Sequence, residues 1–265
     1  MNNLVIICAI LLLVLLFLKV PVYIAVLSAS AVYFIGTPGM NLSIFAQKTI
    51  SGAEGLSLLA IPFFVCAGIF MNYTGVTKRI MNCCEVLTAR MPGGLAQVNI
   101  LLSTLMGGLS GSSLADAAMQ CKMLVPTMES KGYSKSFSTV ITAASGMVVP
   151  LIPPGVGLII YGCINNISIG KLFIAGIGPG IVLCVTLMIF THFLSKKRGY
   201  LPSRTTKIPV SEKIAAVRPA FLPLLLPIII IGGVRIGVFT ASEAGTVAIV
   251  YAVLLGLLYK ELTLK

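Results

Sequence analysis

The stretch that most constrains the fold of this chain is residues 93–127, an apolar segment with a polar interruption in its middle. Gly107 to Ser113 reads GGLSGSS. Each glycine there weakens a helix by about 1 kcal/mol relative to alanine, and the serines bring hydroxyl groups into an apolar setting. The apolar arm on either side is shorter than the roughly 20 residues that a helix needs to cross a bilayer. We therefore expect a re-entrant helical hairpin whose tip holds free backbone groups and hydroxyls at membrane depth.

The composition indicates an all-α integral membrane protein with several spans. Hydrophobic residues make up 57% of the chain and charged residues only 10%, against about 25% charged in an ordinary soluble domain. The net charge of +12 follows from topology. With the N-terminus outside and one crossing per span, only Lys48, Lys171 and Arg235 of the 19 lysines and arginines lie outside, as the positive-inside rule requires. We therefore expect membrane lipid, and no nucleic acid, around this chain.

Apolar runs and turn signals divide the rest of the chain into a polytopic helical bundle. The expected spans are residues 4–18, 22–36, 57–73 with a kink at Pro62, 171–194, 219–236 and 242–258. Two amphipathic segments, 41–52 and 79–90, are expected at the outer and inner membrane surfaces, and 195–218 is expected to be a basic cytoplasmic loop.

Residues 136–164 contain a second interruption. The segment is too long for one plain span, and it carries TAASG at 142–146 and PLIPPG at 150–155. Two adjacent prolines remove two backbone donors and break a helix. The sequence therefore predicts a discontinuous span, in which two half-helices are joined by extended backbone.

Two helix breaks that meet at membrane depth would gather carbonyl and hydroxyl oxygens around a small cavity. Hard oxygen ligands suit Na⁺, whereas the structural alternative is that small residues only allow close helix packing. Two such clusters, each with helix breakers, favour a functional site. The predicted Na⁺ ligands are Ser110, Ser112, Ser113, Thr142 and Ser145, and the wider ion and substrate site adds Gly111, Asp116, Ala143, Gly146, Pro153 and Pro154.

The acidic residues near helix starts have two readings. Ser113 and Asp116 fit a capping box at the opening of the second hairpin arm, and a carboxylate inside a membrane is also often functional, here as a counter-charge near the ion site. Both readings remain open. Thr240 and Glu243 form the same pattern before the last span, where capping is expected.

A protease alternative comes from the sequence Gly108-Leu109-Ser110-Gly111, which fits the Gly-x-Ser-Gly nucleophile motif of rhomboid-type intramembrane serine proteases. That chemistry needs a histidine base within reach of the serine. His192, the one histidine in the chain, lies near the expected cytoplasmic end of its span. We therefore predict no enzymatic reaction, and no cofactor apart from Na⁺ as a coupling ion.

Several long motifs in order resemble one transporter family. They are LLAIPFF (58–64), GLSGSSLADAA (108–118), LVPTMESKGY (124–133), TAASG, PLIPPG, IIYG (159–162), SIGKLFIAGI (168–177) with PG at 179–180, and GVFTASEAGTVAIVYA (237–252). Together they resemble the large membrane subunit of tripartite ATP-independent periplasmic (TRAP) transporters, the DctM-like family. Gly155 and Gly157 stand where many relatives carry serine and proline.

The resemblance implies an elevator-type, Na⁺-driven symporter for organic acid uptake, such as a dicarboxylate, keto acid or sugar acid. It implies a multi-pass protein of the bacterial inner membrane with a periplasmic N-terminus. The expected partners are a small four-helix membrane subunit and a periplasmic solute-binding protein. The alternatives are another elevator-type Na⁺/anion symporter without a binding protein, and the intramembrane serine protease.

The same resemblance suggests a division of the chain. Residues 1–92 would supply scaffold and interfacial helices, 93–170 the transport domain, and 171–218 a span with its cytoplasmic loop. Residues 219–265 look like the first two spans of a second, inverted repeat. Because that repeat is incomplete, the chain is expected to be a C-terminally truncated part of such a subunit.

Overall fold

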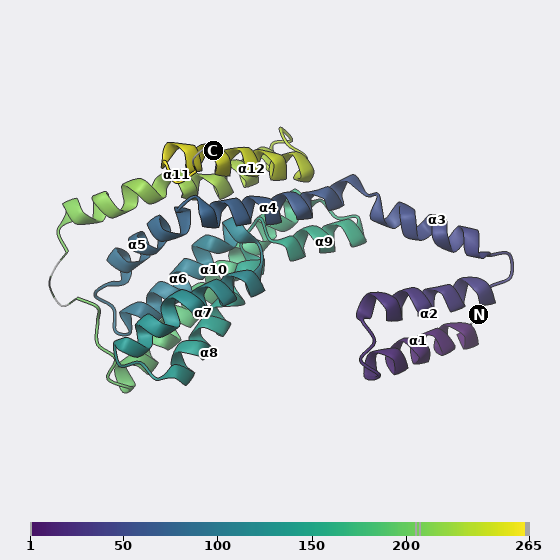
Figure 1. Cartoon of the computed structure of the whole chain (residues 1–265), viewed down its shortest axis with the longest axis horizontal. Coiled ribbons are helices and arrows are strands. Elements are labelled where there is room, and N and C mark those ends of the chain that lie inside the picture. Colours follow the sequence, from purple (N-terminus) through teal and green to yellow (C-terminus); the bar gives the residue numbers. More distant parts are fainter. Residues whose placement is uncertain (1, 205, 207, 263–265) are drawn as a thin grey trace. The chain divides into compact units, whose positions relative to one another are not determined.

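The computed structural model of the chain describes residues 2–204, 206 and 208–262, which form helices and connecting turns with no strand among them (Figure 1). The helices form two compact units, residues 1–55 and 56–265. The all-helical architecture expected from the composition is therefore confirmed for the described residues.

The first unit consists of α1 (Asn2–Phe17), α2 (Val22–Gly36) and α3 (Leu42–Ala53). The end of α2 packs against the start of α1, since a Cβ atom on Gly36 would stand 2.7 Å from Leu4 Cδ1. Asn41 caps α3 by accepting a hydrogen bond from the Ile44 N–H at 3.0 Å. These helices confirm the helical structure predicted at 4–18, 22–36 and 41–52. The crossing of a membrane by the first two, and the placement of 41–52 at a membrane surface, stay predictions.

The second unit holds two pairs of packed helices at one side. Its elements there are the 3₁₀ turn η1 (Leu56–Leu59), α4 (Ala60–Tyr73), α5 (Val76–Thr88), α11 (Val210–Arg235) and α12 (Ala241–Leu258). α12 packs along α4, and α11 packs along α5 (Figure 1). Gly245 allows α12 to approach α4 closely. A Cβ atom on Gly245 would stand 2.7 Å from the Cβ atom of Phe63, so a side chain there would clash with α4.

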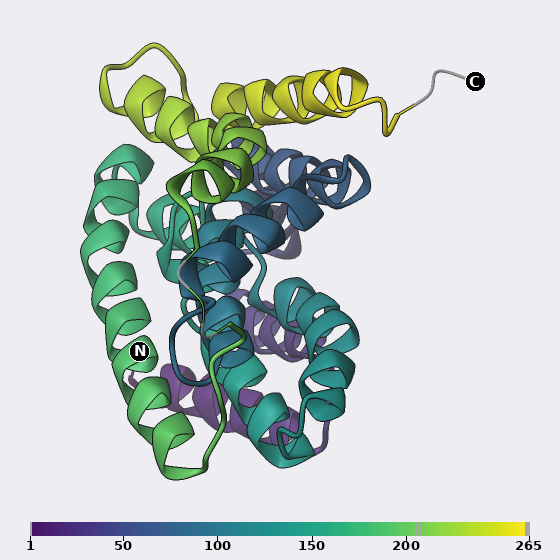
Figure 2. The ribbon, with the colours of Figure 1, turned by 90° about the vertical axis from the view of Figure 1, so that its left-hand side faces the viewer.

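A further group of helices completes the second unit. They are α6 (Gly94–Ser110), α7 (Ser113–Ser130), α8 (Lys135–Gly146), α9 (Val156–Asn165) and the long α10 (Ile169–Lys197), which runs along one side of this unit in Figure 2. α6 packs against α5, α7, α8 and α10. Its apolar residues serve two cores: Val98 and Leu102 belong to one and Leu95 and Ile100 to the other. α6 is thus the central helix of the unit.

Two expectations about these helices are wrong. The kink expected at Pro62 is absent from α4; instead a 3₁₀ turn precedes the helix, and Pro62 lies in the first turn, where its missing N–H has no partner to lose. The loop expected at 195–218 is shorter, because α10 continues to Lys197 and α11 begins at Val210. Lysine and arginine are good helix formers, so charge in this stretch marked helix ends rather than loop.

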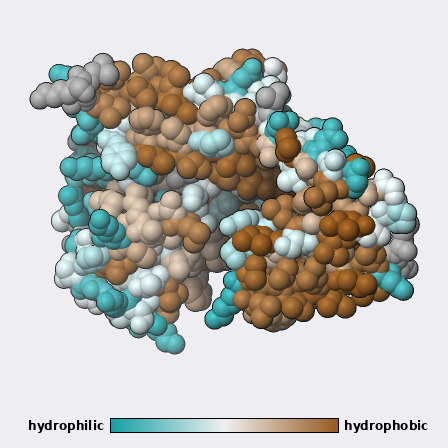
Figure 3. Space-filling model, turned by 45° about the vertical axis from the view of Figure 1, so that its right-hand side comes forward, coloured by the Kyte–Doolittle hydropathy of each residue, from teal (hydrophilic) through white to brown (hydrophobic). Residues whose placement is uncertain are grey.

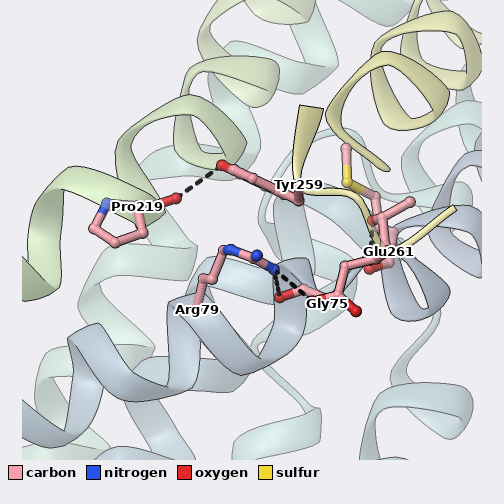
Figure 4. Close-up of polar contacts among 7 residues, drawn as sticks. Gly75, Arg79, Pro219, Tyr259 and Glu261 are labelled. Carbon is pink, nitrogen blue, oxygen red and sulfur yellow. Dashed lines mark hydrogen bonds and ion pairs between the residues drawn. The ribbon is translucent and has the colours of Figure 1, made fainter. Parts of the chain in front are cut away.

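α11 begins nine residues before the span predicted at 219–236 and contains three prolines. Pro219, Pro223 and Pro227 all lie inside the helix. Pro223 has no N–H to donate to the Pro219 carbonyl one turn earlier, and the Tyr259 hydroxyl donates to that oxygen instead, at 2.9 Å (Figure 4). A tyrosine of α12's C-terminal cap thus replaces a missing hydrogen bond of α11.

Three described helices are long and apolar enough to cross a membrane by length and composition: α10, α11 and α12. α8, together with the 3₁₀ turn η2 (Val149–Leu151) and α9, passes the same test as one span, bent by 43° at its break. Large apolar side chains are exposed on both units, among them Ile6, Leu13, Phe190 and Phe193, and Figure 3 shows broad apolar surfaces. Exposed surface of this kind fits contact with lipid.

Candidate functional site

The first helix break lies between α6 and α7. Gly111 adopts the left-handed conformation with φ of 60°, and Ser112 is extended and caps α7 by accepting from the Ala115 N–H at 3.4 Å. The two helices then run back along each other, because Gln120 Nε2 of α7 donates to Ser103 Oγ of α6 at 2.7 Å. The predicted helical hairpin with its break in GGLSGSS is confirmed; its re-entry into a membrane stays a prediction.

The second break lies between α8 and α9. α8 ends at Gly146, the short 3₁₀ turn η2 (Val149–Leu151) follows, and Ile152 to Gly155 are non-helical before α9 begins. Pro153 and Pro154 occupy this gap and are buried. The predicted discontinuous helix is therefore confirmed, and its break coincides with the paired prolines.

The two breaks touch each other. The Val156 N–H donates to the Gly111 carbonyl at 3.4 Å. A Cβ atom on Gly111 would stand 2.8 Å from the Pro154 carbonyl oxygen, and one on Gly108 would stand 3.1 Å from that of Pro153. Within the described ranges, no donor is bonded to either proline carbonyl. The glycines thus let the carbonyl oxygens of Pro153 and Pro154, which accept no hydrogen bond among the described residues, approach the hairpin tip.

A buried polar network joins α6 to α8 beside these breaks. Asn99 Nδ2 donates to Thr142 Oγ1 at 2.6 Å, and Ser145 Oγ donates to Asn99 Oδ1 at 2.9 Å. Ser103 Oγ donates to Ser145 Oγ at 3.0 Å. All four residues are fully buried. Because buried polar groups must be paired, this network fixes how α8 sits against α6.

The network extends to α7 through Ser103. Gln120 Nε2, which donates to Ser103 Oγ, also donates to Asp116 Oδ2 at 2.6 Å. Asp116 is 1% exposed and Gln120 fully buried. The carboxylate therefore lies inside the hairpin, and its hydrogen-bond partner among the described residues is the neutral amide of Gln120.

The predicted site residues fall into two groups. Thr142 and Ser145 face α6 inside the polar network, whereas Ser112 lies at the tip and serves as the cap of α7. Among the described residues, no hydrogen bond joins the hydroxyls of Ser112 or Ser113 to those of Thr142 or Ser145. A backbone approach links the groups instead: a Cβ atom on Gly146 would stand 3.5 Å from the Ser113 carbonyl oxygen.

The other predicted residues are distributed around the breaks. Ala143 is exposed and points away from the network. Gly111, Pro153 and Pro154 form the contact between the breaks. Ser110 ends α6, and its side chain lies outside the described part of the structure.

The capping box expected from Ser113 and Asp116 is wrong. Ser112, one residue earlier, is the cap, so Asp116 is the fourth residue of the helix, one past the position that a capping box uses, and its carboxylate accepts from the Gln120 amide instead. The capping box of Thr240 and Glu243 is confirmed: the Glu243 carboxylate accepts from the Thr240 N–H at 2.8 Å, and the Thr240 hydroxyl accepts from the Glu243 N–H at 3.3 Å.

Three residues of the network were missed by the sequence reading: Asn99, Ser103 and Gln120. A signal was present, since Asn99 and Ser103 are spaced i, i+4 in an otherwise apolar arm, and Asp116 and Gln120 repeat that spacing in the next. Side chains four apart share one helix face. Two such polar pairs in facing arms indicate a polar seam within the hairpin.

The base of the hairpin is held by the loop between α10 and α11. The Gly93 N–H donates to the Tyr200 carbonyl at 3.2 Å, and the Ser134 N–H donates to the Tyr200 hydroxyl at 3.1 Å. The Tyr133 and Tyr200 rings stack with centroids 4.4 Å apart. The hydrogen bonds with Ser134 lower the pKa of the Tyr200 phenol. The start of α6, the α7–α8 turn and the α10–α11 loop thus meet at one end of the unit.

These features define a class of protein: a helical membrane protein in which a broken helical hairpin meets a proline-broken helix. The match to a family is specific. The model of the DctM component of tripartite ATP-independent periplasmic transporters matches residues 9–265. The chain belongs to this family, the large permease family of TRAP transporters.

Relatives from several bacteria carry the same family name. The chain is 41% identical over 252 residues to the sialic acid TRAP transporter large permease SiaM of Vibrio cholerae, covering 95% of this chain and 58% of that protein. It is 40% identical over 244 residues to the 2,3-diketo-L-gulonate TRAP transporter large permease YiaN of Escherichia coli, covering 92% of this chain and 57% of that protein. The chain thus spans about half the length of the relatives it matches. These relatives are transporters.

Proposed function

We propose that this chain forms part of the membrane permease of a Na⁺-coupled TRAP transporter that imports an organic acid. The observation that carries the proposal is the contact between the two helix breaks, at Gly111 on one side and Pro154 with Val156 on the other. Broken helices that meet within a helical bundle are how many secondary transporters form ion and substrate sites, because helix ends supply free carbonyl and N–H groups.

The proposed coupling site holds Na⁺ between the breaks. Ser110, Ser112 and Ser113 would offer oxygens from the hairpin tip, and Thr142 and Ser145 from the end of α8. The free carbonyls of Pro153 and Pro154 support this placement, because Na⁺ prefers hard oxygen ligands.

The substrate class follows from the relatives. The names of two of them specify sialic acid and 2,3-diketo-L-gulonate, both organic acids. We infer that the permease containing this chain takes a substrate of that class, delivered by a periplasmic solute-binding protein. Transport would proceed by an elevator movement of the hairpin and broken helix, supported by a small four-helix membrane subunit.

The proposed location is the bacterial inner membrane, with the N-terminus in the periplasm. This orientation places the loop between α10 and α11, which carries Arg198 and Arg204, in the cytoplasm. The contacts of that loop with Gly93 and Ser134 support a shared side for these segments, and the choice of the cytoplasmic side rests on the positive-inside rule.

The test is uptake of labelled organic acids by proteoliposomes that contain the permease including this chain, its small subunit and its binding protein. Uptake is expected only with an inward Na⁺ gradient. Ser112→Ala combined with Ser145→Ala is expected to weaken the Na⁺ dependence, whereas Thr139→Ala, which removes an exposed hydroxyl of α8 bonded only to its own helix, is not. An unchanged Na⁺ dependence in the double variant would show that the ion site is elsewhere. Uptake without binding protein would favour the other class of elevator-type Na⁺/anion symporter.

A further inference from the structure

A cavity of about 410 Å³ lies at the base of the hairpin, where the α7–α8 turn meets the loop that follows α10. Lys131 and Gly132 line it from the turn, and Arg198, Tyr200 and Ser203 line it from the loop. Its volume is in the range of small-molecule sites, roughly 300–1,000 Å³. The proposed coupling site between the two helix breaks does not use this cavity.

The charged side chains that line the cavity are both cations. Lys131 and Arg198 are exposed, and neither forms an ion pair among the described residues. Of the nearby carboxylates, Glu212 is paired with Arg204, and Glu129 does not line the cavity. Because a cleft lined by one sign of charge attracts the opposite sign, the cavity favours an anionic ligand.

Aromatic rings hold one of the two cations in place. The Arg198 guanidinium lies 5.3 Å from the centre of the Phe137 ring, and Tyr133 and Tyr200 line the cavity as a stacked pair. After the hydrogen bonds with Ser134, the neighbouring guanidinium is a further cause that lowers the pKa of the Tyr200 phenol. A guanidinium that stacks on a ring keeps N–H donors for an anion, and its planar fork suits a phosphate group.

An apolar groove of about 500 Å³ runs along α10 toward this cavity. Its lining includes Phe190 and Phe193, which are 61% and 67% exposed, and it continues to Leu194 and Lys197. Leu194 and Arg198 are four residues apart and so share one face of the helix. The groove therefore ends within one turn of the cavity, as expected for an acyl chain whose headgroup occupies the cavity.

The position of the cations along α10 also suits a headgroup. Residues 172–194 contain no aspartate, glutamate, lysine or arginine, and Lys196, Lys197 and Arg198 follow directly. Such a stretch is about 35 Å long at 1.5 Å per residue, close to the roughly 30 Å of the bilayer core. When α10 crosses a membrane, these cations lie at the level of the headgroups, where anionic lipids attract basic segments.

We propose that the cavity lined by Lys131 and Arg198 binds the phosphate of an anionic phospholipid, with an acyl chain in the groove on α10. The two cations bracket the phosphate, and the Ser203 hydroxyl, which forms no hydrogen bond among the described residues, is free to donate to it. A zwitterionic phospholipid is disfavoured because it brings a further cation beside the two. The bound lipid fastens the base of the hairpin to the end of α10. The inference needs a membrane around the chain and does not depend on Na⁺ coupling.

The test titrates the purified chain in detergent micelles with dioleoylphosphatidylglycerol and, as the zwitterionic reference, with dioleoylphosphatidylcholine. Native mass spectrometry counts bound lipid, and a thiol-reactive dye reports thermal unfolding through the buried Cys83 and Cys84. Phosphatidylglycerol is expected to bind at one molecule per chain and to raise the unfolding temperature more than phosphatidylcholine does. Glycerophosphoglycerol and inorganic phosphate, at equal ionic strength, are expected to bind at least tenfold more weakly than the lipid, because neither fills the apolar groove.

Two double variants separate the cavity from general surface charge. Lys131→Gln with Arg198→Gln removes the cations of the cavity, and Lys135→Gln with Lys196→Gln removes two exposed cations of the same end that do not line it. Both pairs weaken the attraction to an anionic surface equally. The cavity pair is expected to lose at least tenfold more affinity for phosphatidylglycerol, because charge-assisted hydrogen bonds are lost as well. Each lipid-induced shift is measured against the same variant without lipid, so the lost contact between Arg198 and Phe137 does not enter it.

Three results would overturn the inference. Equal losses in the two double variants would reduce the effect to surface charge, and equal binding of the two lipids would remove the preference for an anionic headgroup. Binding of glycerophosphoglycerol or phosphate as tight as that of the lipid would make the cavity a site for a soluble phosphate compound. None of these results bears on the Na⁺ dependence of uptake, so the proposed function is tested separately.

Discussion

Gly111 holds the tip of the hairpin in a conformation that other residues adopt only with strain. Its φ of 60° lies in the left-handed region, and its Cα faces the Pro154 carbonyl with no room for a Cβ atom. Both constraints act at the point where the two breaks meet. The residue is therefore required by backbone geometry and by packing together.

Gly111→Ala is expected to destabilise the chain by at least about 2 kcal/mol, since left-handed backbone alone costs a non-glycine residue about 1–2 kcal/mol. Gly132→Ala tests that cost by itself, because Gly132 has φ of 85° with nothing within 4 Å of its Cβ position. Gly178→Ala, inside α10 and equally open, is expected to be neutral or stabilising. Thermal unfolding in detergent ranks the three. Equal losses for Gly111→Ala and Gly132→Ala would show that the contact with Pro154 contributes nothing.

Asn99 is the residue on which the polar network depends. Its amide donates to Thr142 and accepts from Ser145, and all three residues are fully buried. Asn99→Ala leaves those partners unpaired and is expected to cost about 2–4 kcal/mol. The exposed Asn165, which donates only to the Tyr161 carbonyl of its own helix, is the control, and Asn165→Ala is expected to cost under about 0.5 kcal/mol.

A loss below about 1 kcal/mol for Asn99→Ala, in the same unfolding assay, would mean that water replaces the asparagine in the network and that α8 does not depend on it. The prediction therefore tests whether the α6–α8 contact is dry.

The sequence predicts the residues of the breaks better than their partners. Glycine, serine and paired proline interrupt helices by local rules, so Gly111, Pro153 and Pro154 could be placed from sequence. Asn99 and Gln120 could not, because their role depends on which face of α6 meets α7 and α8. The cap of α7 was displaced by one residue for a related reason: Ser112 and Ser113 are equivalent by composition, and only the turn at Gly111 selects between them.

At the scale of elements, α11 and α12 are tied to α5 by one arginine. Arg79 lies 3.8 Å above the Tyr259 ring, donates to the Gly75 carbonyl at 3.0 Å and pairs with Glu261 at 3.5 Å (Figure 4). Tyr259 in turn donates to the Pro219 carbonyl of α11. Three helices thus meet through the guanidinium and the phenol.

These contacts predict a ranking of variants. Arg79→Ala loses the ring contact, the carbonyl contact and the ion pair together, so it is expected to cost about 1–2 kcal/mol. Tyr259→Phe keeps the ring and loses one hydrogen bond, about 1 kcal/mol. Glu261→Gln loses only a half-exposed ion pair, under about 0.5 kcal/mol. Unfolding in detergent measures the stability of all three variants. If Glu261→Gln lost as much stability as Arg79→Ala, the ion pair with Glu261, and not the contact with the Tyr259 ring, would account for the contribution of Arg79.

The helices themselves were predictable where apolar runs are bounded by glycine or proline, as in α2 and α6, and the start of α12 was predictable from its capping pattern. The start of α11 was not, because the polar, basic residues before Pro219 were expected to form a loop. The hydrogen bond from Tyr259 shows how the helix continues through its prolines: a distant side chain donates to the carbonyl that Pro223 leaves free. Tertiary contacts of this kind are invisible to local rules.

At the scale of the whole molecule, the arrangement of the second unit bears on topology. α10 is 29 residues long, about 43 Å at 1.5 Å per residue, which exceeds the roughly 30 Å of a bilayer core. Ser168 precedes one end of it, and Tyr200 follows the other and contacts Ser134. We therefore predict that the loops at 131–134 and 198–204 lie on one face of the membrane and the turn at Ser168 on the opposite face.

The orientation itself is a prediction from charge, and accessibility can test it. In a background with the seven native cysteines replaced, we expect Ser130→Cys and Leu201→Cys to react with a membrane-impermeant maleimide in inside-out vesicles only. Both residues are exposed, Leu201 by 79%. Ser168→Cys, exposed at the other end of α10, is expected to react in right-side-out vesicles only. Labelling after detergent permeabilisation controls for intrinsic reactivity. The reverse pattern would place the basic loops outside, against the positive-inside rule, and labelling of Ser130 and Leu201 from opposite sides would contradict the contact between Ser134 and Tyr200, because one end of a helical unit cannot lie on both faces of a membrane.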